Sequence, residues 1–182
     1  MYLNNEKNIL FDCYAMRSFL YHQCQYGWWK WNSGKKTKID VLPQPYSTSD
    51  LYGYWFDTNN TPEVRILKLM ILAPNGVARD ALLIELGDNV EEIKQESLWK
   101  FDPNSSVLTQ KVTKMTYTIN GKIEPIDFGE VEPVKVSVTI KKRGDDIFMN
   151  TVSDDGTVET YQKITKEMKD KIHQKAKENA RK

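Results

Sequence analysis

Residues 64–86 read VRILKLMILAPNGVARDALLIEL, and this stretch decides the fold class. Two runs rich in apolar residues, 64–72 and 77–86, flank the tetrapeptide Ala-Pro-Asn-Gly at 73–76. Asn-Gly between two such runs is the strongest short-range signal of a β-hairpin, because both residues tolerate the positive φ of its turn. The stretch therefore predicts two antiparallel strands joined by a tight turn.

Short strands and turns continue on both sides of this hairpin. Residues 134–141 alternate valine or isoleucine with lysine, serine or threonine, which is the period of a half-buried strand. The candidate strands are 51–56, 64–72, 77–86, 92–101, 107–119, 134–142, 147–152 and 157–164. Eight short strands joined mostly by hairpins favour an up-and-down meander that closes on itself. We therefore expect a mainly β protein built around an antiparallel eight-stranded barrel.

The chain outside these strands has a different composition at each end. The three predicted segments are an N-terminal extension (1–48), a barrel domain (49–164) and a C-terminal charged, basic helix (165–182). An apolar stripe at helical spacing, formed by Ile9, Cys13, Met16 and Leu20, predicts a helix over residues 8–22. A Trp-rich segment follows that helix. No Gly or Pro interrupts the tail, which favours the second helix.

The charge of the chain limits its partners. It has 182 residues, 40% of them apolar, with 26 basic and 25 acidic side chains and a net charge of +1. A chain of this length buries a substantial core, and the near-neutral balance excludes a polyanion binder that acts through net charge alone. The centre, residues 49–164, carries thirteen basic and nineteen acidic side chains, whereas both ends are basic.

The first predicted strand carries a motif, Leu-Tyr-Gly-Tyr-Trp-Phe at 51–56. A Gly-x-Trp in the first strand of an eight-stranded meander resembles the lipocalin-like (calycin) barrels, here over residues 50–164. In that family the tryptophan packs across the closed end of the barrel and the glycine lets the chain bend, so the resemblance assigns these roles to Trp55 and Gly53. The last strand has no arginine to stack on Trp55, and Lys163 is its only basic residue. The resemblance implies an internal cavity for a small apolar molecule.

Two hypotheses for the function follow. The first is a non-enzymatic binding protein whose barrel holds a small apolar or amphipathic ligand. The expected lining of the barrel interior is Leu67, Leu69, Ile71, Leu83, Met115, Tyr117, Val136, Val138 and Phe148. The alternative is a protein–protein interaction module, such as an inhibitor, an immunity-type protein or an assembly subunit, that uses the aromatic N-terminal segment and the basic tail. Its expected partner surface is Trp28, Trp29, Trp31, Lys35 and Lys36.

Catalytic and metal-binding motifs are missing from the sequence. It contains no Gly-rich phosphate loop and no Gly-x-Ser-x-Gly, and only two histidines. Cys13, His22 and Cys24 are too few and wrongly spaced for a structural zinc site. We therefore expect no catalytic residues, no metal and no cofactor. The expected partner is a small apolar ligand or a protein; nucleic acid is not favoured, because no RNP-type or zinc-finger pattern occurs.

The expected compartment rests on targeting signals. No stretch approaches the ~20 apolar residues of a membrane-spanning helix, and no signal peptide is recognised. We expect a cytoplasmic protein, or an extracytoplasmic one if a leader was removed before Met1. Cys13 and Cys24 would pair only in an oxidising compartment.

Overall fold

The computed structural model describes residues 38–126 and 129–170. Lys38–Lys163 form one compact unit, which begins before the expected boundary at residue 49. Residues 164–170 belong to a second unit, in which residues 166–170 are helical and the Met168 N–H donates to Thr165 Oγ1 at 3.2 Å. The predicted helix over 8–22 and the Trp-rich segment lie outside the described residues.

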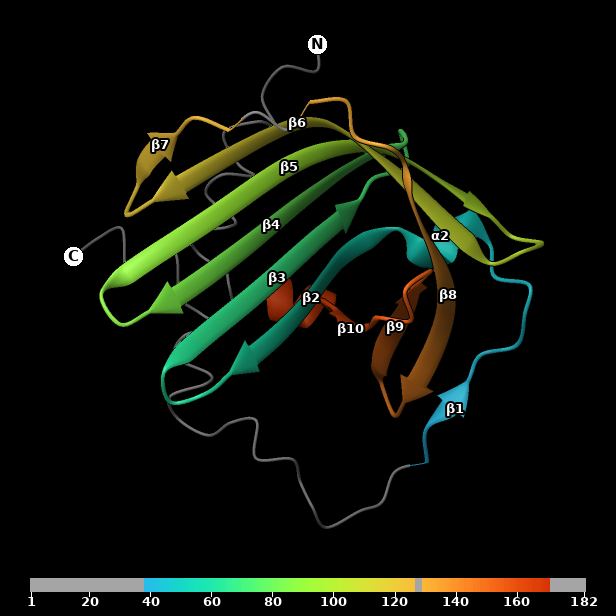
Figure 1. Cartoon of the computed structure of the whole chain (residues 1–182). Coiled ribbons are helices and arrows are strands. Elements are labelled where there is room, and N and C mark those ends of the chain that lie inside the picture. The colour runs from blue at the N-terminus through green and yellow to red at the C-terminus, as the bar shows by residue number, and fades with distance from the viewer. Residues whose placement is uncertain (1–37, 127–128, 171–182) are drawn as a thin grey trace. The chain divides into compact units, whose positions relative to one another are not determined.

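The compact unit consists of ten strands and one short helix (Figure 1). In chain order these elements are β1 (Asp40–Val41), α2 (Thr48–Leu51), β2 (Gly53–Asn60), β3 (Val64–Leu72), β4 (Val77–Leu86), β5 (Asn89–Asp102), β6 (Val107–Ile119), β7 (Lys122–Glu124), β8 (Val134–Arg143), β9 (Asp146–Ser153) and β10 (Val158–Lys163). All eight strands expected from the sequence are present, as β2–β6 and β8–β10. The predicted mainly β fold is confirmed.

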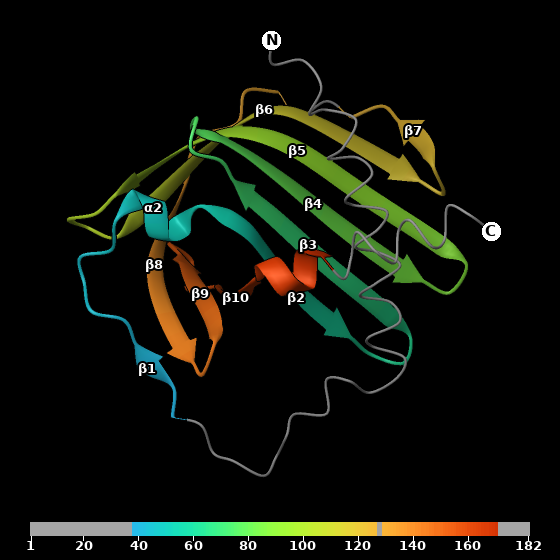
Figure 2. The same ribbon diagram turned by 180° about the vertical axis from the view of Figure 1, so that it is seen from behind.

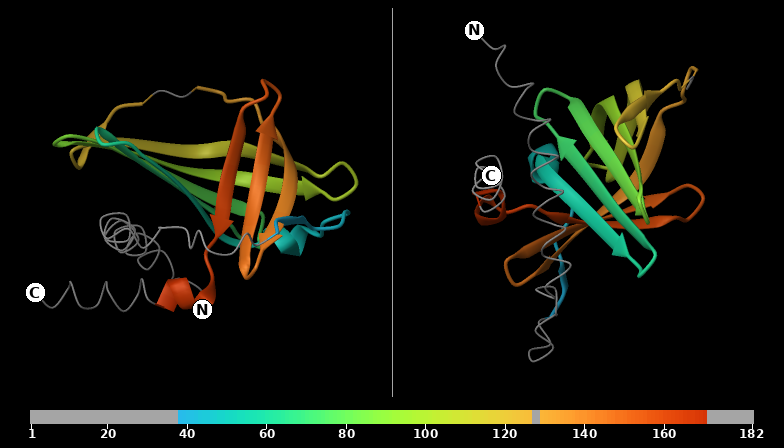
Figure 3. Two further views of the ribbon diagram at one scale, coloured as in Figure 1. Left: turned by 90° about the horizontal axis from the view of Figure 1, so that it is seen from below. Right: turned by 90° about the vertical axis from the view of Figure 1, so that its left-hand side faces the viewer.

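The eight long strands close into an antiparallel barrel. Strands β2–β6 lie side by side as one curved sheet in opposite views (Figures 1 and 2). Strands β8–β10 cross this sheet near one end (Figure 3). The ring closes where β6 pairs with β8, through Val107 and Ser137 among others, and where β10 pairs with β2, through Lys163 and Trp55. Each strand of the ring is thus the neighbour of the next one along the chain, apart from the short β7, and the meander expected from the sequence is confirmed.

Three short elements were not predicted. Strands β1 and β7 span two and three residues, which is too short for an alternating pattern to appear. Helix α2 replaces the start of the first predicted strand, because the Ser47 N–H donates to Asp50 Oδ2 at 2.8 Å and so satisfies a free backbone donor at the helix start.

The apolar core occupies the end of the barrel where β8–β10 cross the long strands. Its buried members are Tyr46, Leu51, Trp55, Met70, Leu72, Ala78, Trp99, Phe101, Leu108, Val138, Ile140, Met149 and Tyr161. Trp99 fixes the β3–β4 turn here, since its indole N–H donates to the Ala73 carbonyl at 3.0 Å. The Tyr52 ring packs edge-on against Trp99 with the ring centroids 5.9 Å apart. Burial of each large side chain contributes roughly 1.5–3 kcal/mol, so this end of the barrel carries most of the apolar stabilisation.

Candidate functional site

Cross-strand register shows which face of each strand points into the barrel. Trp55 on β2 pairs with Met70 on β3, and both belong to the core. Met70 pairs with Asp80, Asp80 with Gln95, and Gln95 with Met115. Directly paired residues lie on the same face of a sheet, so this whole row faces the interior.

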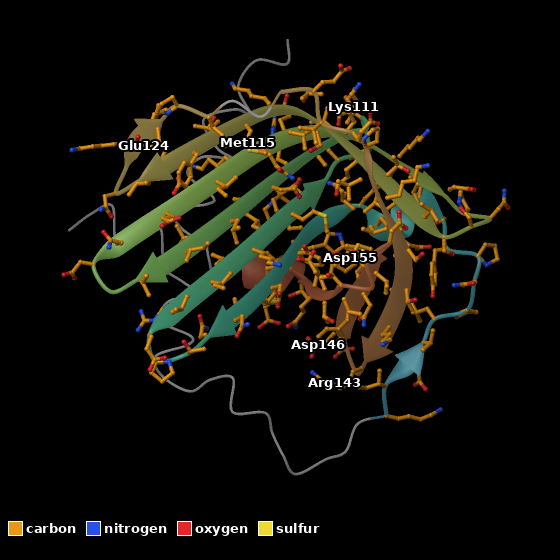
Figure 4. The ribbon with its side chains drawn as sticks, viewed as in Figure 1. Lys111, Met115, Glu124, Arg143, Asp146 and Asp155 are labelled. Atoms are coloured by element: carbon orange, nitrogen blue, oxygen red, sulfur yellow. The ribbon has the colours of Figure 1, made fainter. Side chains whose placement is uncertain are left out.

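Four of the nine expected lining residues face the interior. Met115 lies midway along β6 in the row just described (Figure 4). Tyr117 pairs with Ile93 in the next row. On β8, Val138 is part of the core and Val136 packs against it.

The other five, Leu67, Leu69, Ile71, Leu83 and Phe148, face outward, which corrects the expected lining. The first four have odd numbers on β3 and β4. The inward-facing residues of these two strands have even numbers, because Met70 pairs with the core residue Trp55 on β2 and Asp80 pairs with Met70. Phe148 precedes the core residue Met149, and the Arg143 guanidinium lies 5.1 Å from its ring centroid. Arg143 lies at the tip of the β8–β9 hairpin (Figure 4). Apolar character did not reveal the correct face because β3 and β4 carry large apolar side chains on both faces.

Gly53, Trp55 and Lys163 form one structural group at the closed end. Trp55 is fully buried, and its indole N–H donates to the Leu51 carbonyl at 2.8 Å. The Lys163 ammonium lies 5.0 Å from the Trp55 ring centroid and donates to the Asp50 carbonyl at 2.9 Å. Gly53 has φ of 128°, and a Cβ there would lie 3.3 Å from Lys163 Cε. The glycine therefore leaves room for the lysine that covers the tryptophan.

Above this closed end, polar side chains meet inside the barrel. We call them the interior cluster, and its members are Asp57, Lys68, Asp80, Gln95, Gln110, Glu159 and Tyr161. They come from six strands of the ring, β2 to β6 and β10. Only closure of the barrel brings the β10 residues to the β3 and β4 residues.

Glu159 is the most fully paired carboxylate of the interior cluster. It forms an ion pair with Lys68, and the Tyr161 hydroxyl donates to its Oε2 at 2.7 Å. Burial opposes ionisation of Glu159, but the hydrogen bonds from Lys68 and Tyr161 and the lysine charge together lower its pKa. Burial and this carboxylate raise the pKa of Tyr161, so the phenol stays protonated as a donor.

Asp80 is bound only by neutral groups. The side-chain amides of Gln95 and Gln110 donate to its Oδ2 at 3.2 and 3.4 Å. No described residue donates to its Oδ1 or forms an ion pair with it. Burial raises the pKa of Asp80 to about 6, against the effect of the two amide hydrogen bonds, and the charge of Glu159 raises it further.

The third carboxylate, Asp57, is also pushed towards its neutral form. Burial raises its pKa although the charge of Lys68 and a backbone hydrogen bond from Thr58 act in the opposite direction. The interior cluster thus holds three carboxylates and one ammonium, and that ammonium is paired with Glu159. When all four groups are ionised the cluster has an excess of two negative charges.

Ser97 lies next to the interior cluster and has an unsatisfied hydroxyl. Its side chain is fully buried, and Ser97 Oγ has no hydrogen-bond partner among the described residues. Ser97 forms a cross-strand row with Ala78 and Val112. Each residue of this row is two positions along its own strand from a member of the interior cluster, namely Gln95, Asp80 and Gln110 respectively. A β-bulge between Glu96 and Ser97 interrupts the β5–β6 ladder at this point. Bulges of this kind often re-aim a side chain beside a functional site.

Beyond the interior cluster the inward face is mostly apolar, although it also carries Glu91, which pairs with Ile84 and accepts a hydrogen bond from the Tyr117 hydroxyl at 2.9 Å. The apolar residues on this side, which we call the apolar rim, are Ile66, Leu82, Ile84, Ile93 and Tyr117. All five remain partly solvent-exposed although they face inward. The interior therefore changes from a buried apolar end, through a polar layer, to a half-exposed and mostly apolar surface.

Sequence reasoning missed the interior cluster because acidic residues were assigned to turns and strand edges. A signal was nevertheless present, since Lys68 and Asp80 stand in the middle of two runs that are rich in apolar residues. Once Trp55 is known to face inward, the period of two places Asp57 inside as well. The sequence alone could not show that Glu159, about 80–100 positions further along the chain, joins them.

Several expectations fall on other parts of the chain. The expected partner surface, Trp28, Trp29, Trp31, Lys35 and Lys36, lies outside the described residues, as do Cys13, His22 and Cys24. Within residues 38–126 and 129–170, no group of three or more His, Cys, Asp or Glu side chains is arranged to hold a metal ion. No helix in the described part of the chain has the length and apolar character needed to cross a membrane.

Three comparisons with known proteins, against family models, curated proteins and solved structures, gave no significant match.

Proposed function

We propose that this protein is a non-enzymatic binding protein that holds one small amphipathic molecule inside a lipocalin-like barrel. The observation that carries the proposal is the layered interior. A polar cluster that includes a carboxylate with no cationic partner in the described part of the chain lies between a closed apolar end and the half-exposed apolar rim. A molecule with a polar head and an apolar tail matches these two layers.

Stability alone does not account for the polar layer. Burial of polar and charged groups costs free energy unless their hydrogen bonds and charges are satisfied. Asp80 has no cationic partner, and Ser97 Oγ has no partner at all among the described residues. Apolar side chains at these positions would extend the core at lower cost, so we attribute the polar groups to recognition of a ligand.

The size and closure of the barrel support the same function. Eight strands enclose an interior that either side chains fill or one small ligand occupies. The group formed by Gly53, Trp55 and Lys163 closes one end, as the tryptophan and glycine do in lipocalin-like barrels. The opposite end is lined by the half-exposed apolar rim, which is where a ligand would enter.

The test is binding of a neutral fluorescent probe, N-phenyl-1-naphthylamine, to the full-length protein and to two adjacent variants. Leu82→Trp adds an indole to the inward face of β4, and Leu83→Trp adds the same group to the outward face. We expect saturable binding to the wild type, about tenfold weaker binding to Leu82→Trp, and wild-type binding to Leu83→Trp.

Circular dichroism would establish that both variants are folded. If the probe did not bind to the wild type, or if both substitutions weakened it equally, the barrel interior would not be the site. The proposed function would then be rejected.

A further inference from the structure

We infer that the interior cluster selects a ligand with a primary ammonium head group, which supplies the cation that Asp80 lacks. This inference rests on the proposed function and specifies its ligand class. Three features support it: the charge balance of the cluster, the acceptor atoms it leaves open, and its place between two apolar layers.

The charge balance favours a cation. Lys68 is paired with Glu159, and the two donors to Asp80 are the uncharged amides of Gln95 and Gln110. Asp57 also lies within the field of Lys68 and Glu159, and its burial disfavours the charged form. An ammonium placed beside Asp80 would bring the excess of negative charge from two to one. A carboxylate or phosphate head group would increase it.

The open acceptors favour a head group with several N–H donors. Both amide donors bind Asp80 Oδ2, so Oδ1 is left without a hydrogen-bond donor among the described residues. Ser97 Oγ is a second acceptor, on the adjacent inward-facing row, roughly 7 Å away along the strands. A primary ammonium has three N–H donors, and its hydrogen bonds to a carboxylate are among the stronger ones in proteins.

A quaternary ammonium fits this site less well. Such cations are recognised by the faces of several aromatic rings. The groups around Asp80 are instead amides, carboxylates and a hydroxyl, and the Tyr161 phenol is committed to Glu159. The ligand class is therefore a primary alkyl or aralkyl amine whose apolar part lies along the rim residues Leu82, Ile93 and Tyr117.

The experiment compares ligands that differ only in the head group. Octylamine, octyltrimethylammonium, octanol and octanoate would each displace N-phenyl-1-naphthylamine from the full-length protein at pH 7.5. We expect octylamine to bind about tenfold more tightly than octanol, with octyltrimethylammonium and octanoate weaker than octylamine by at least about the same factor.

Asp80→Asn tests the residue. It removes the negative charge but retains an amide oxygen that can accept from Gln95 and Gln110. We expect the preference for octylamine over octanol to fall from about tenfold to below roughly threefold. Asp88→Asn, in the exposed turn between β4 and β5, removes the same charge outside the barrel and serves as the matched control. It should keep the full preference.

Each outcome separates this inference from the proposed function. If all four compounds displaced the probe equally, or if octanoate were preferred, the amine inference would be overturned and the barrel would still be a binding site. If Asp80→Asn kept the tenfold preference, Asp80 would not be the ammonium-binding group, and the inference would again fail. If the probe itself did not bind to the wild type, both would fail together. Should Asp80→Asn not fold, the order of head groups measured on the wild type still decides the ligand class.

Discussion

The ammonium of Lys163 lies over the indole of Trp55, 5.0 Å from the ring centroid, at the seam where β10 pairs with β2. The two residues are directly paired across this seam, which joins the last strand of the barrel to the first. The same ammonium donates to the Asp50 carbonyl in α2. One side chain thus ties the end of the barrel strands to their beginning, while half-burial lowers the pKa of the lysine.

Replacement of Lys163 should weaken the barrel at this seam. Lys163→Ala removes the cation–π contact, the hydrogen bond to Asp50 and the packing of the lysine stem on Trp55. We expect the free energy of unfolding to fall by about 1–2 kcal/mol, measured by urea denaturation. Lys163→Arg should retain most of the stability because a guanidinium also stacks on indole. The control is Lys100→Ala, at an exposed position of β5, which should change the free energy of unfolding by less than about 0.5 kcal/mol. An equal loss of stability in the two alanine variants would contradict the role assigned to Lys163.

Gly53→Ala should be more destabilising than an alanine at an ordinary turn glycine. Gly53 has φ of 128°, which residues with a Cβ rarely adopt, and its new Cβ would lie 3.3 Å from Lys163 Cε. We expect a loss of about 2–3 kcal/mol in thermal or urea unfolding. Gly87→Ala is the control, since Gly87 has φ of 58° and no atom within 4 Å of the added Cβ, and it should cost about 1 kcal/mol. Equal costs at the two positions would show that the close approach to Lys163 is unimportant.

The pH dependence of stability should contain a contribution from Asp80. Burial raises its pKa from 3.8 to about 6, so between these values the folded protein holds a proton that the unfolded chain has lost. This group therefore makes the free energy of unfolding fall as the pH rises from about 4 to about 6. The full cost is reached as the pH rises past the folded-state pKa and is on the order of 3 kcal/mol, because the shift is about two pKa units and each unit corresponds to about 1.4 kcal/mol.

Asp80→Asn isolates this contribution. The variant should be more stable than the wild type at pH 7 and similar to it near pH 4, measured by urea unfolding across that range without ligand. Asp102 and Asp155 have lowered pKa values and produce the opposite slope, but they are present in both proteins and cancel in the difference. A variant less stable than the wild type at pH 7 would show that Asp80 is better satisfied than its contacts indicate.

Ser97→Ala should separate stability from ligand recognition. The buried hydroxyl has no partner among the described residues, so its removal should raise the free energy of unfolding by about 1 kcal/mol. The same variant should bind octylamine more weakly than the wild type does. Ser105→Ala is the matched control, because Ser105 donates to Asp102 at 2.6 Å in an exposed turn and its loss should be mildly destabilising. Destabilisation by Ser97→Ala would mean that the hydroxyl already has a structural partner.

Several parts of the fold followed from local sequence. The β3–β4 hairpin was predictable because Asn75-Gly76 favours a tight turn and apolar runs flank it. On β8, strict alternation correctly indicated that Val136 and Val138 face the core. On β3 and β4 both faces carry large apolar side chains, so the same reasoning had no basis for a choice and selected Leu67 and Leu83, which face outward.

The sequence by itself determined the strands, their turns and their order in the meander, because turn chemistry and a period of two act over a few neighbouring residues. Only the tertiary structure decided which face of each strand is inside. That choice depends on the pairing of β6 with β8 and of β10 with β2, which joins residues far apart in the chain. The same closure brings Glu159 to Lys68 and leaves Asp80 without a cation among residues 38–126 and 129–170, so the candidate site is a product of long-range register that no local pattern contains.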